Sequence, residues 1–244
     1  MQGLFALLRN IDPRRRARLN RLRRANDLRL PTGPNLAALP VLQEVFEARA
    51  YADFFPLWTD AVVVDVGAHY GYFSLFAARH TSPNARIFAL EPSAANMAQL
   101  QQHLVLNAIK KVTPIAAALA VDSGTGQLVS SVSFNHRLAD KGETGKPVRL
   151  VSLEDLMTEV DLPRIDFLKL DCEGSEYALL DSLSSDTLSR ISTISLEFHH
   201  GRKATQTGLH LRTLLLQRGF SVPVYAHQPT RMGRNYGRLI ATRL

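Results

Sequence analysis

Residues 62–71 read VVVDVGAHYG, and this stretch decides the fold. A mostly apolar run surrounds Asp65, and Gly67 and Gly71 follow it before a segment of helix length. Such a run without polar alternation predicts a strand buried on both faces, which is typical of parallel sheets. Gly67 permits a sharp turn, and the start of the next helix offers free N–H groups to an anion. The stretch therefore predicts a strand, a ligand-binding loop and a helix.

Short apolar runs alternate with helix-length stretches along the rest of the chain. Strands are expected at residues 62–66, 86–90, 112–117, 165–170, 191–198, 220–225 and 238–242. Helices are expected at residues 73–80, 94–106, 152–158 and 176–183. This alternation predicts a doubly wound, mostly parallel, seven-stranded α/β sheet that binds ligands at the carboxyl ends of its strands. The last two strands are expected to pair as an antiparallel hairpin.

Three zones are expected along the 244 residues, because a chain of this size and 45% hydrophobic content can bury one substantial core. They are a basic arm (residues 1–30), a helical cap (31–60) and the main domain (61–244). Within the cap, residues 39–58 read as helix. The Gly-, Ser- and charge-rich segment between Asp122 and Lys146 is expected to be a loop or small hairpin over the strand ends.

The positive charge is concentrated in the arm. Residues 1–30 contain nine arginines and two acidic residues, Asp12 and Asp27. Their net charge of +7 equals the formal net charge of the whole chain. The remaining residues carry 20 basic and 20 acidic side chains, so a basic groove along the main domain is not expected. The arginines could bind an anionic membrane surface or RNA, but a solvated extension or an exchanged helix is favoured, since no aromatic platform accompanies them.

The expected location is a reducing cytoplasm. The single cysteine, Cys172, excludes an intrachain disulfide and a multi-cysteine zinc site. Residues 3–8 are apolar but far shorter than a membrane span, and they lead into arginines without a small-residue cleavage site. Peripheral attachment to a membrane through the arm is the alternative.

The loop itself separates two kinds of nucleotide ligand. A dinucleotide site requires GxGxxG, and here His69 and Tyr72 stand at the second and third glycine positions. S-adenosylmethionine presents one carboxylate and one ammonium instead of a pyrophosphate, so a bulky loop residue is tolerated and Asp65 can face the ammonium. Glu91, twenty residues past Gly71, stands where doubly wound folds place the acid that binds ribose hydroxyls. The alternatives are a plain tight turn and a solvated acid.

Four stretches resemble the FkbM family of methyltransferases. They are DVGAHYGYFSL (65–75), LEPSAANMAQLQQHLVLN (90–107), FLKLDCEGSE (167–176) and SLEFHH (195–200). The resemblance covers residues 62–200 and implies a class I methyltransferase (Rossmann-like) fold, S-adenosylmethionine as donor, and usually O-methylation of sugars or natural products. It assigns the methionine part to the loop and the ribose to Glu91. The cofactor-binding residues are then Asp65, Gly67, Ala68, His69, Gly71 and Glu91, with Asp122, on a looser match, near the adenine.

Methyl transfer to oxygen needs a positioned hydroxyl and a group that removes its proton. Asp171 is the first choice as base or substrate anchor, with Glu173, Glu197 and His199 around it. Glu197 and His199 are two residues apart on a strand and therefore share a face. The alternative for His199 is a partly buried histidine held by its neighbour. These side chains also suit a divalent ion, but carboxylate groups are frequent in metal-free sites, so no metal is predicted.

Three functions remain open from the sequence. The leading one is an O-methyltransferase that acts on a saccharide or natural-product small molecule. The second is an RNA methyltransferase recruited by the basic arm, and the third is a noncatalytic nucleotide-binding module. The neutral main domain counts against RNA, and the acids retained at the strand ends count against a noncatalytic module.

Overall fold

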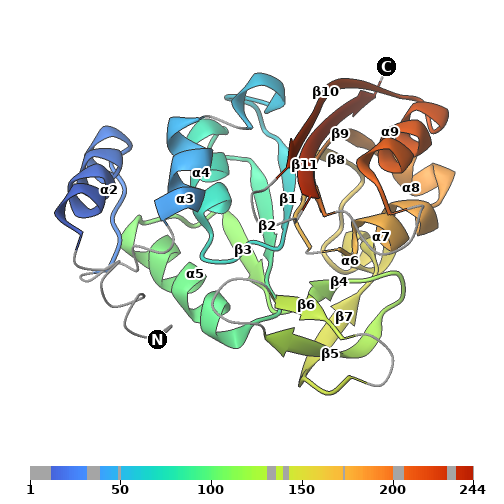
Figure 1. Ribbon diagram of the computed structural model, residues 1–244, viewed down its shortest axis with the longest axis horizontal. Coiled ribbons are helices and arrows are strands. Elements are labelled where there is room, and N and C mark those ends of the chain that lie inside the picture. The colour runs from blue at the N-terminus through green and yellow to red at the C-terminus, as the bar shows by residue number, and fades with distance from the viewer. Residues whose placement is uncertain are drawn as a thin grey trace.

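The computed structural model describes residues 12–31, 39–48, 51–130, 136–139, 143–172, 174–199, 206–229 and 235–243. Its centre is a seven-stranded sheet with the strand order β10-β11-β9-β8-β1-β2-β3 (Figure 1). The strands are β1 (Val62–Val66), β2 (Arg86–Leu90), β3 (Val112–Ile115), β8 (Ile165–Leu170), β9 (Ile191–His199), β10 (Phe220–Pro229) and β11 (Asn235–Arg243). β1 runs parallel to β2 and β8, whereas β11 pairs antiparallel with β9 and β10. The predicted doubly wound sheet and its C-terminal hairpin are confirmed.

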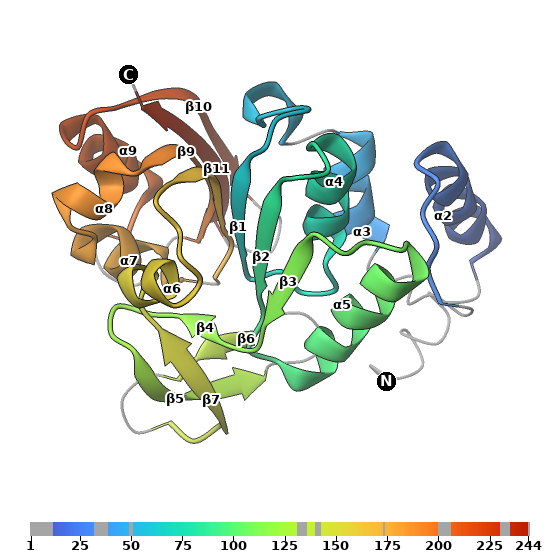
Figure 2. The same cartoon turned by 180° about the vertical axis from the view of Figure 1, so that it is seen from behind.

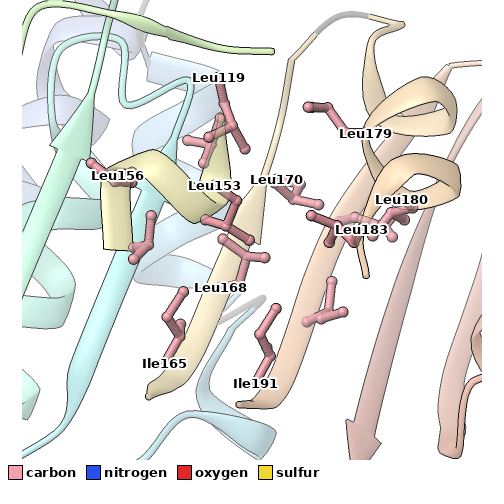
Figure 3. Packing of buried hydrophobic residues seen from close by; sticks show 14 of the residues in the cluster. Leu119, Leu153, Leu156, Ile165, Leu168, Leu170, Leu179, Leu180, Leu183 and Ile191 are labelled. Atoms are coloured by element: carbon pink, nitrogen blue, oxygen red, sulfur yellow. The ribbon is translucent and has the colours of Figure 1, made fainter. Parts of the chain in front are cut away.

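Helices cover both faces of this sheet (Figures 1 and 2). One layer contains α2 (Pro13–Ala25), α3 (Leu39–Leu42), α4 (Tyr72–His80) and α5 (Ala94–Leu106). The other contains α6 (Leu153–Glu159), α7 (Glu176–Ser182), α8 (Ser185–Ser189) and α9 (Gly208–Gln217). Each layer forms its own buried cluster with the strands, and Figure 3 shows leucines of α6 and α7 packed against β8. The sheet is therefore buried on both faces, as the apolar runs predicted. α8 and α9 were not predicted.

Residues 118–151 contain a second, four-stranded sheet where the sequence predicted only a loop or small hairpin over the strand ends; the antiparallel pairing within residues 128–138 agrees with the hairpin. Its order is β4-β7-β5-β6, and its strands are β4 (Ala118–Leu119), β5 (Gly124–Ser130), β6 (His136–Leu138) and β7 (Lys146–Val151). It lies beyond the carboxyl end of β3 and beside α6 (Figure 2). Most described residues of β5 and β7 are exposed or partly exposed, so the apolar alternation that marks a half-buried strand is missing.

The expected continuous helix over residues 39–58 is wrong. α3 runs into a π-helical turn, η2 (Gln43–Glu47), and a separate 3₁₀ turn, η3 (Ala52–Phe54), follows. Tyr51 and Phe55 pack against Phe73 of α4, with ring centroids 4.7 and 6.0 Å apart. A straight helix of 20 residues spans about 30 Å and would carry these rings away from α4. Packing of the aromatic side chains therefore overrides the helical pattern.

The described part of the basic arm packs on the main domain. Leu19 and Leu22 of α2 are buried in the same cluster as residues of α4 and α5. Arg79 donates hydrogen bonds to the carbonyls of Asn26 and Asp27, and Asn107 exchanges two hydrogen bonds with the backbone of Arg29. The apolar side of α2 is thus covered by its own chain. Among the described helices, none has the length and apolar character needed to span a membrane.

If α2 is an integral part of the fold, Leu19→Ala should lower the free energy of unfolding by about 2–5 kcal/mol, because it leaves a cavity in a packed cluster. Val105→Ala is the control, since Val105 is 78% exposed, and it should change stability by less than about 0.5 kcal/mol. Urea unfolding followed by circular dichroism measures both. Equal stability of the two variants would show that α2 does not contribute to the core.

Candidate active site

A cavity of about 370 Å³ lies at the carboxyl ends of β1, β2 and β8. This volume falls within the range of small-molecule sites, and the position is the switch point at which doubly wound sheets bind ligands. Four parts of the chain form its wall: the loop after β1, the strand ends, the cap and the second sheet. They contribute, among others, Gly67, Ala68, His69, Glu91, Asp171, Glu197, Glu44, Tyr51, Leu128 and His136.

The loop after β1 requires glycine at two positions, for two different reasons. Gly67 has φ +71° and its N–H donates to the Leu90 carbonyl at 3.1 Å. A Cβ atom on Gly67 would lie 1.9 Å from the carbonyl oxygen of Asp171, so only glycine lets the loop approach β8. Gly71 has φ +79°, and a Cβ there would lie 2.9 Å from the Leu100 side chain. Gly67 lines the cavity, whereas Gly71 sets the packing of α4 on α5.

Asp65 and Lys169 form a buried ion pair beneath this loop. The two residues are directly opposite each other on β1 and β8, and Lys169 Nζ lies 3.1 Å from Asp65 Oδ1. Ser74 of α4 donates to the other oxygen at 2.6 Å. Burial by itself lowers the pKa of Lys169, but the carboxylates of Asp65 and Asp171 outweigh it and hold that pKa above its ordinary value. Asp65 is fully buried and is not among the cavity-lining residues, and its charged partner within the chain is Lys169.

Lys169 also organises the backbone of the loop. Its ammonium donates to the carbonyls of Val66 and Gly67 at 3.4 and 3.3 Å and lies 3.8 Å from Asp171 Oδ2. The same cation therefore connects the end of β1, the loop and the first residue after β8. The contact between Lys169 and Asp65 depends on strand register, which no local pattern in the sequence reveals.

Glu91 is held at the end of β2 by three hydrogen bonds. The backbone N–H of Ser93 and the side-chain amide of Asn96 donate to Oε1 at 2.8 and 3.3 Å, and the N–H of His69 donates to Oε2 at 2.8 Å. Burial raises the pKa of Glu91 despite these bonds. A carboxylate has about four acceptor positions, so Oε2 can accept a further hydrogen bond from a ligand hydroxyl. Burial also lowers the pKa of His69 to about 4, which leaves its ring neutral at pH 7.

Two of the four predicted catalytic residues lie on the wall of the cavity. Asp171 and Glu197 line it. His199 lies behind Glu197, with Nε2 3.4 Å from Glu197 Oε1 and Nδ1 3.5 Å from Oε1 of the fully buried Glu176. Oε1 of Glu176, the first residue of α7, in turn accepts hydrogen bonds from the backbone N–H groups of Cys172 and Gly174. His199 is therefore placed to act on the cavity only through Glu197.

Other predicted residues do not take part in the described wall. Asp122 is exposed between β4 and β5 and is not among the residues that line the cavity. Glu173 lies outside the described residues. Within the described ranges, no three His, Cys, Asp or Glu side chains converge in a way that could hold a metal ion.

Sequence reasoning missed three polar residues at the cap end of the cavity. The Tyr51 hydroxyl lies 3.5 Å from Glu44 Oε1, and the Arg238 guanidinium carbon lies 4.5 Å from the centre of the Tyr51 ring. Arg238 is directly opposite Glu197 on β9 and β11. The sequence does contain one indication of this site. Glu44 interrupts the apolar residues that stand at helical spacing in residues 41–45.

The other end of the cavity is mainly apolar. The end of β2, the second sheet and the segment that leads into this sheet form it. The sequence did not reveal this apolar wall, because it predicted only a loop or small hairpin in place of the second sheet. Its apolar residues are Leu90, Ala117, Ala118, Leu119, Leu128 and Leu138. The cavity thus has a polar end near the cap and an apolar end near the second sheet.

Comparisons with known proteins agree with this architecture. A family model described as the methyltransferase FkbM domain matches residues 65–222. The 31-O-demethyl-FK506 methyltransferase FkbM of Streptomyces tacrolimicus is 27% identical over 211 residues, which cover 70% of this chain and 81% of that protein. The AMB antimetabolite synthetase AmbE of Pseudomonas aeruginosa is 28% identical over 243 residues, which cover 80% of this chain but 11% of AmbE. The chain therefore spans about a ninth of AmbE.

Among solved structures, an rRNA methylase from Streptococcus thermophilus is similar with a TM-score of 0.50 and 12% sequence identity. The match covers 82% of this chain and 96% of that chain. At this identity the likeness concerns the fold, which is the α/β fold described above.

Lys169→Met should lower the free energy of unfolding by about 3–5 kcal/mol, because it leaves the Asp65 carboxylate buried without its cation. The double variant Asp65→Asn with Lys169→Met should recover a large part of this loss, since no buried charge then remains. Urea unfolding curves of the two proteins test this. A single variant as stable as the wild type would show that the pair does not hold β1 to β8.

Proposed function

The chain belongs to the FkbM methyltransferase family, and we propose that it transfers a methyl group from S-adenosylmethionine to a hydroxyl oxygen of a saccharide or natural-product small molecule. One observation supports the donor most directly. A loop whose glycine cannot carry a side chain and a buried glutamate with a remaining acceptor position face the same cavity.

The residues of the cavity fit S-adenosylmethionine by their chemistry. The loop at Gly67 packs closely against the end of β8 and lines the cavity where the methionine part would lie, and His69 adds no charge at neutral pH. Glu91 Oε2 would accept a hydrogen bond from a ribose hydroxyl, and the apolar end beside the second sheet would cover the adenine. When bound, this donor supplies a methyl group on a positively charged sulfur.

The acceptor would lie at the polar end of the cavity. Asp171 lies 3.8 Å from the ammonium of Lys169 and can accept a hydrogen bond from a hydroxyl of the acceptor. Glu197 can accept a second one from a neighbouring hydroxyl, supported from behind by His199. Fixing the direction of the hydroxyl oxygen is the main requirement of an in-line displacement, and well-oriented groups account for much of such a rate acceleration.

The surroundings favour a small hydroxylated acceptor over RNA. None of the described arginines of α2 lines the cavity, and Figures 1 and 2 place α2 at the outer edge of the helical layer. Of the basic residues in the wall, Lys169 is buried and Arg137 forms a salt bridge with Glu143. The relative from Streptomyces tacrolimicus, a 31-O-demethyl-FK506 methyltransferase by name, also favours oxygen on a small molecule.

Calorimetry with S-adenosylhomocysteine tests the donor site. Micromolar binding is expected for the wild type, and Glu91→Ala should weaken it at least tenfold, about 1.4 kcal/mol, because the ribose loses its acceptor. Asp122→Asn is a suitable control and should bind as the wild type does, since Asp122 is exposed outside the cavity. No detectable binding to the wild type would refute the proposed donor, and equal affinities in all three proteins would refute the role of Glu91.

Transfer of a labelled methyl group to a panel of acceptors tests the reaction. The panel contains methyl glycosides, polyhydroxylated macrolides, primary amines and a short structured RNA. We expect label in the hydroxylated small molecules, at an oxygen located by mass spectrometry and NMR. Label in the amines or the RNA, with none in the hydroxylated compounds, would contradict the proposed acceptor class while leaving the donor site intact.

A further inference from the structure

Glu44 occupies an unusual place in the cap. It lies in the π-helical turn η2, lines the cavity and is only partly exposed. π-helical turns are rare and occur mostly as single turns. They are frequently found at functional sites. In η2 the neighbours Val45 and Phe46 are buried in the core, while Glu44 remains on the cavity wall. The turn therefore presents one carboxylate to the polar end.

The carboxylates at this end differ in how their charges are balanced. The carboxylate of Asp171 lies 3.8 Å from the ammonium of Lys169, which balances its charge. Glu44 forms no ion pair with any described Lys or Arg, and its hydrogen-bond partner is the hydroxyl of Tyr51. Glu197 likewise has no described Lys or Arg partner, but it contacts His199 at 3.4 Å. Among the described residues, Glu44 is therefore the carboxylate of the polar end that contacts neither a Lys or Arg side chain nor a histidine.

The groups that face Glu44 come from four neighbouring segments. Burial raises the pKa of Glu44, and the charge of Glu197 on β9 raises it further. Arg238 on β11, Lys169 on β8 and the hydroxyl of Tyr51 lower it, but the net direction is upward. A carboxylate in these surroundings binds a proton more readily than one in water, which is what a general base requires.

We propose that Glu44 is the general base that removes the proton from the acceptor hydroxyl. This inference rests on the proposed function and assigns a residue that the family motifs do not contain. As the hydroxyl oxygen forms its bond to the methyl carbon, the hydroxyl proton moves to a Glu44 oxygen and the carbon–sulfur bonding pair stays on sulfur. The proton leaves Glu44 for solvent after the products depart. Asp171 then acts as an anchor that accepts a hydrogen bond from a neighbouring hydroxyl of the acceptor.

Glu44→Gln and Glu47→Gln form a matched pair for the test. Both residues lie in η2, but Glu47 is exposed and forms salt bridges with Arg18 and Arg21. With an acceptor from the panel, Glu44→Gln should lower kcat about 10²- to 10⁴-fold, the usual contribution of a general base. Its affinity for S-adenosylhomocysteine should stay within about twofold of the wild type. Glu47→Gln should keep kcat within about twofold.

The pH profile separates a base from a structural residue. In the wild type kcat should rise with pH through the raised pKa of Glu44, because only the ionised carboxylate accepts a proton. Glu44→Gln should lose this rise, whereas Glu47→Gln should retain it. A Glu44→Gln enzyme with wild-type kcat and an unchanged profile overturns the inference. That result leaves the proposed function standing, since donor binding and label transfer test it separately.

Carbodiimide labelling gives a readout that needs no acceptor. A water-soluble carbodiimide with glycine ethyl ester modifies protonated carboxyl groups, and mass spectrometry compares Glu44 with Glu47 in one peptide digest. As the pH is raised, modification of Glu44 should persist to higher pH than modification of Glu47, because burial raises the pKa of Glu44 while hydrogen bonds from Gln43 and Arg18 lower the pKa of Glu47. An identical pH dependence of the two residues overturns the inference.

Discussion

The buried ion pair between Asp65 and Lys169 is the interaction on which the rest of the site depends. It joins the two strands at the switch point of the sheet, and the same ammonium reaches the loop carbonyls and Asp171. Taking both charges out of water is unfavourable, and the pair persists because Ser74 and the backbone supply further hydrogen bonds. One cation thereby sets the positions of the proposed donor loop and the proposed acceptor anchor together.

The cavity is assembled from segments that are distant in the chain. The cap covers one end, the second sheet forms the other, and the C-terminal hairpin brings Arg238 beside Tyr51. The arm contributes indirectly, because Arg18 and Arg21 of α2 bind Glu47 at the end of the π-helical turn. The side chains of the cap and of the second sheet that line the cavity are expected to decide which acceptor fits. The loop after β1 and Glu91 are expected to bind the proposed donor.

Similar carboxylates acquire different chemistry from their surroundings. Glu91 is fixed by three hydrogen bonds and is suited to bind hydroxyls. Asp65 and Asp171 share the ammonium of Lys169. Glu44 is partly buried without a close cation and is suited to exchange a proton. The assignment of roles therefore follows from burial and from the distance to the nearest cation, and residue type alone does not decide it.

The sequence by itself determined the central sheet, the helices α4 to α7, and the residues at the carboxyl ends of β1, β2 and β8. These features depend on local patterns, namely apolar runs, helical periodicity, and glycines at turns whose backbone conformation favours glycine. Only the tertiary structure decided that Asp65 faces Lys169, that the second sheet closes the cavity, and that Glu44, Tyr51 and Arg238 meet. The reason is physical: strand register, side-chain burial and charge balance arise between segments far apart in the chain, and no local pattern encodes them.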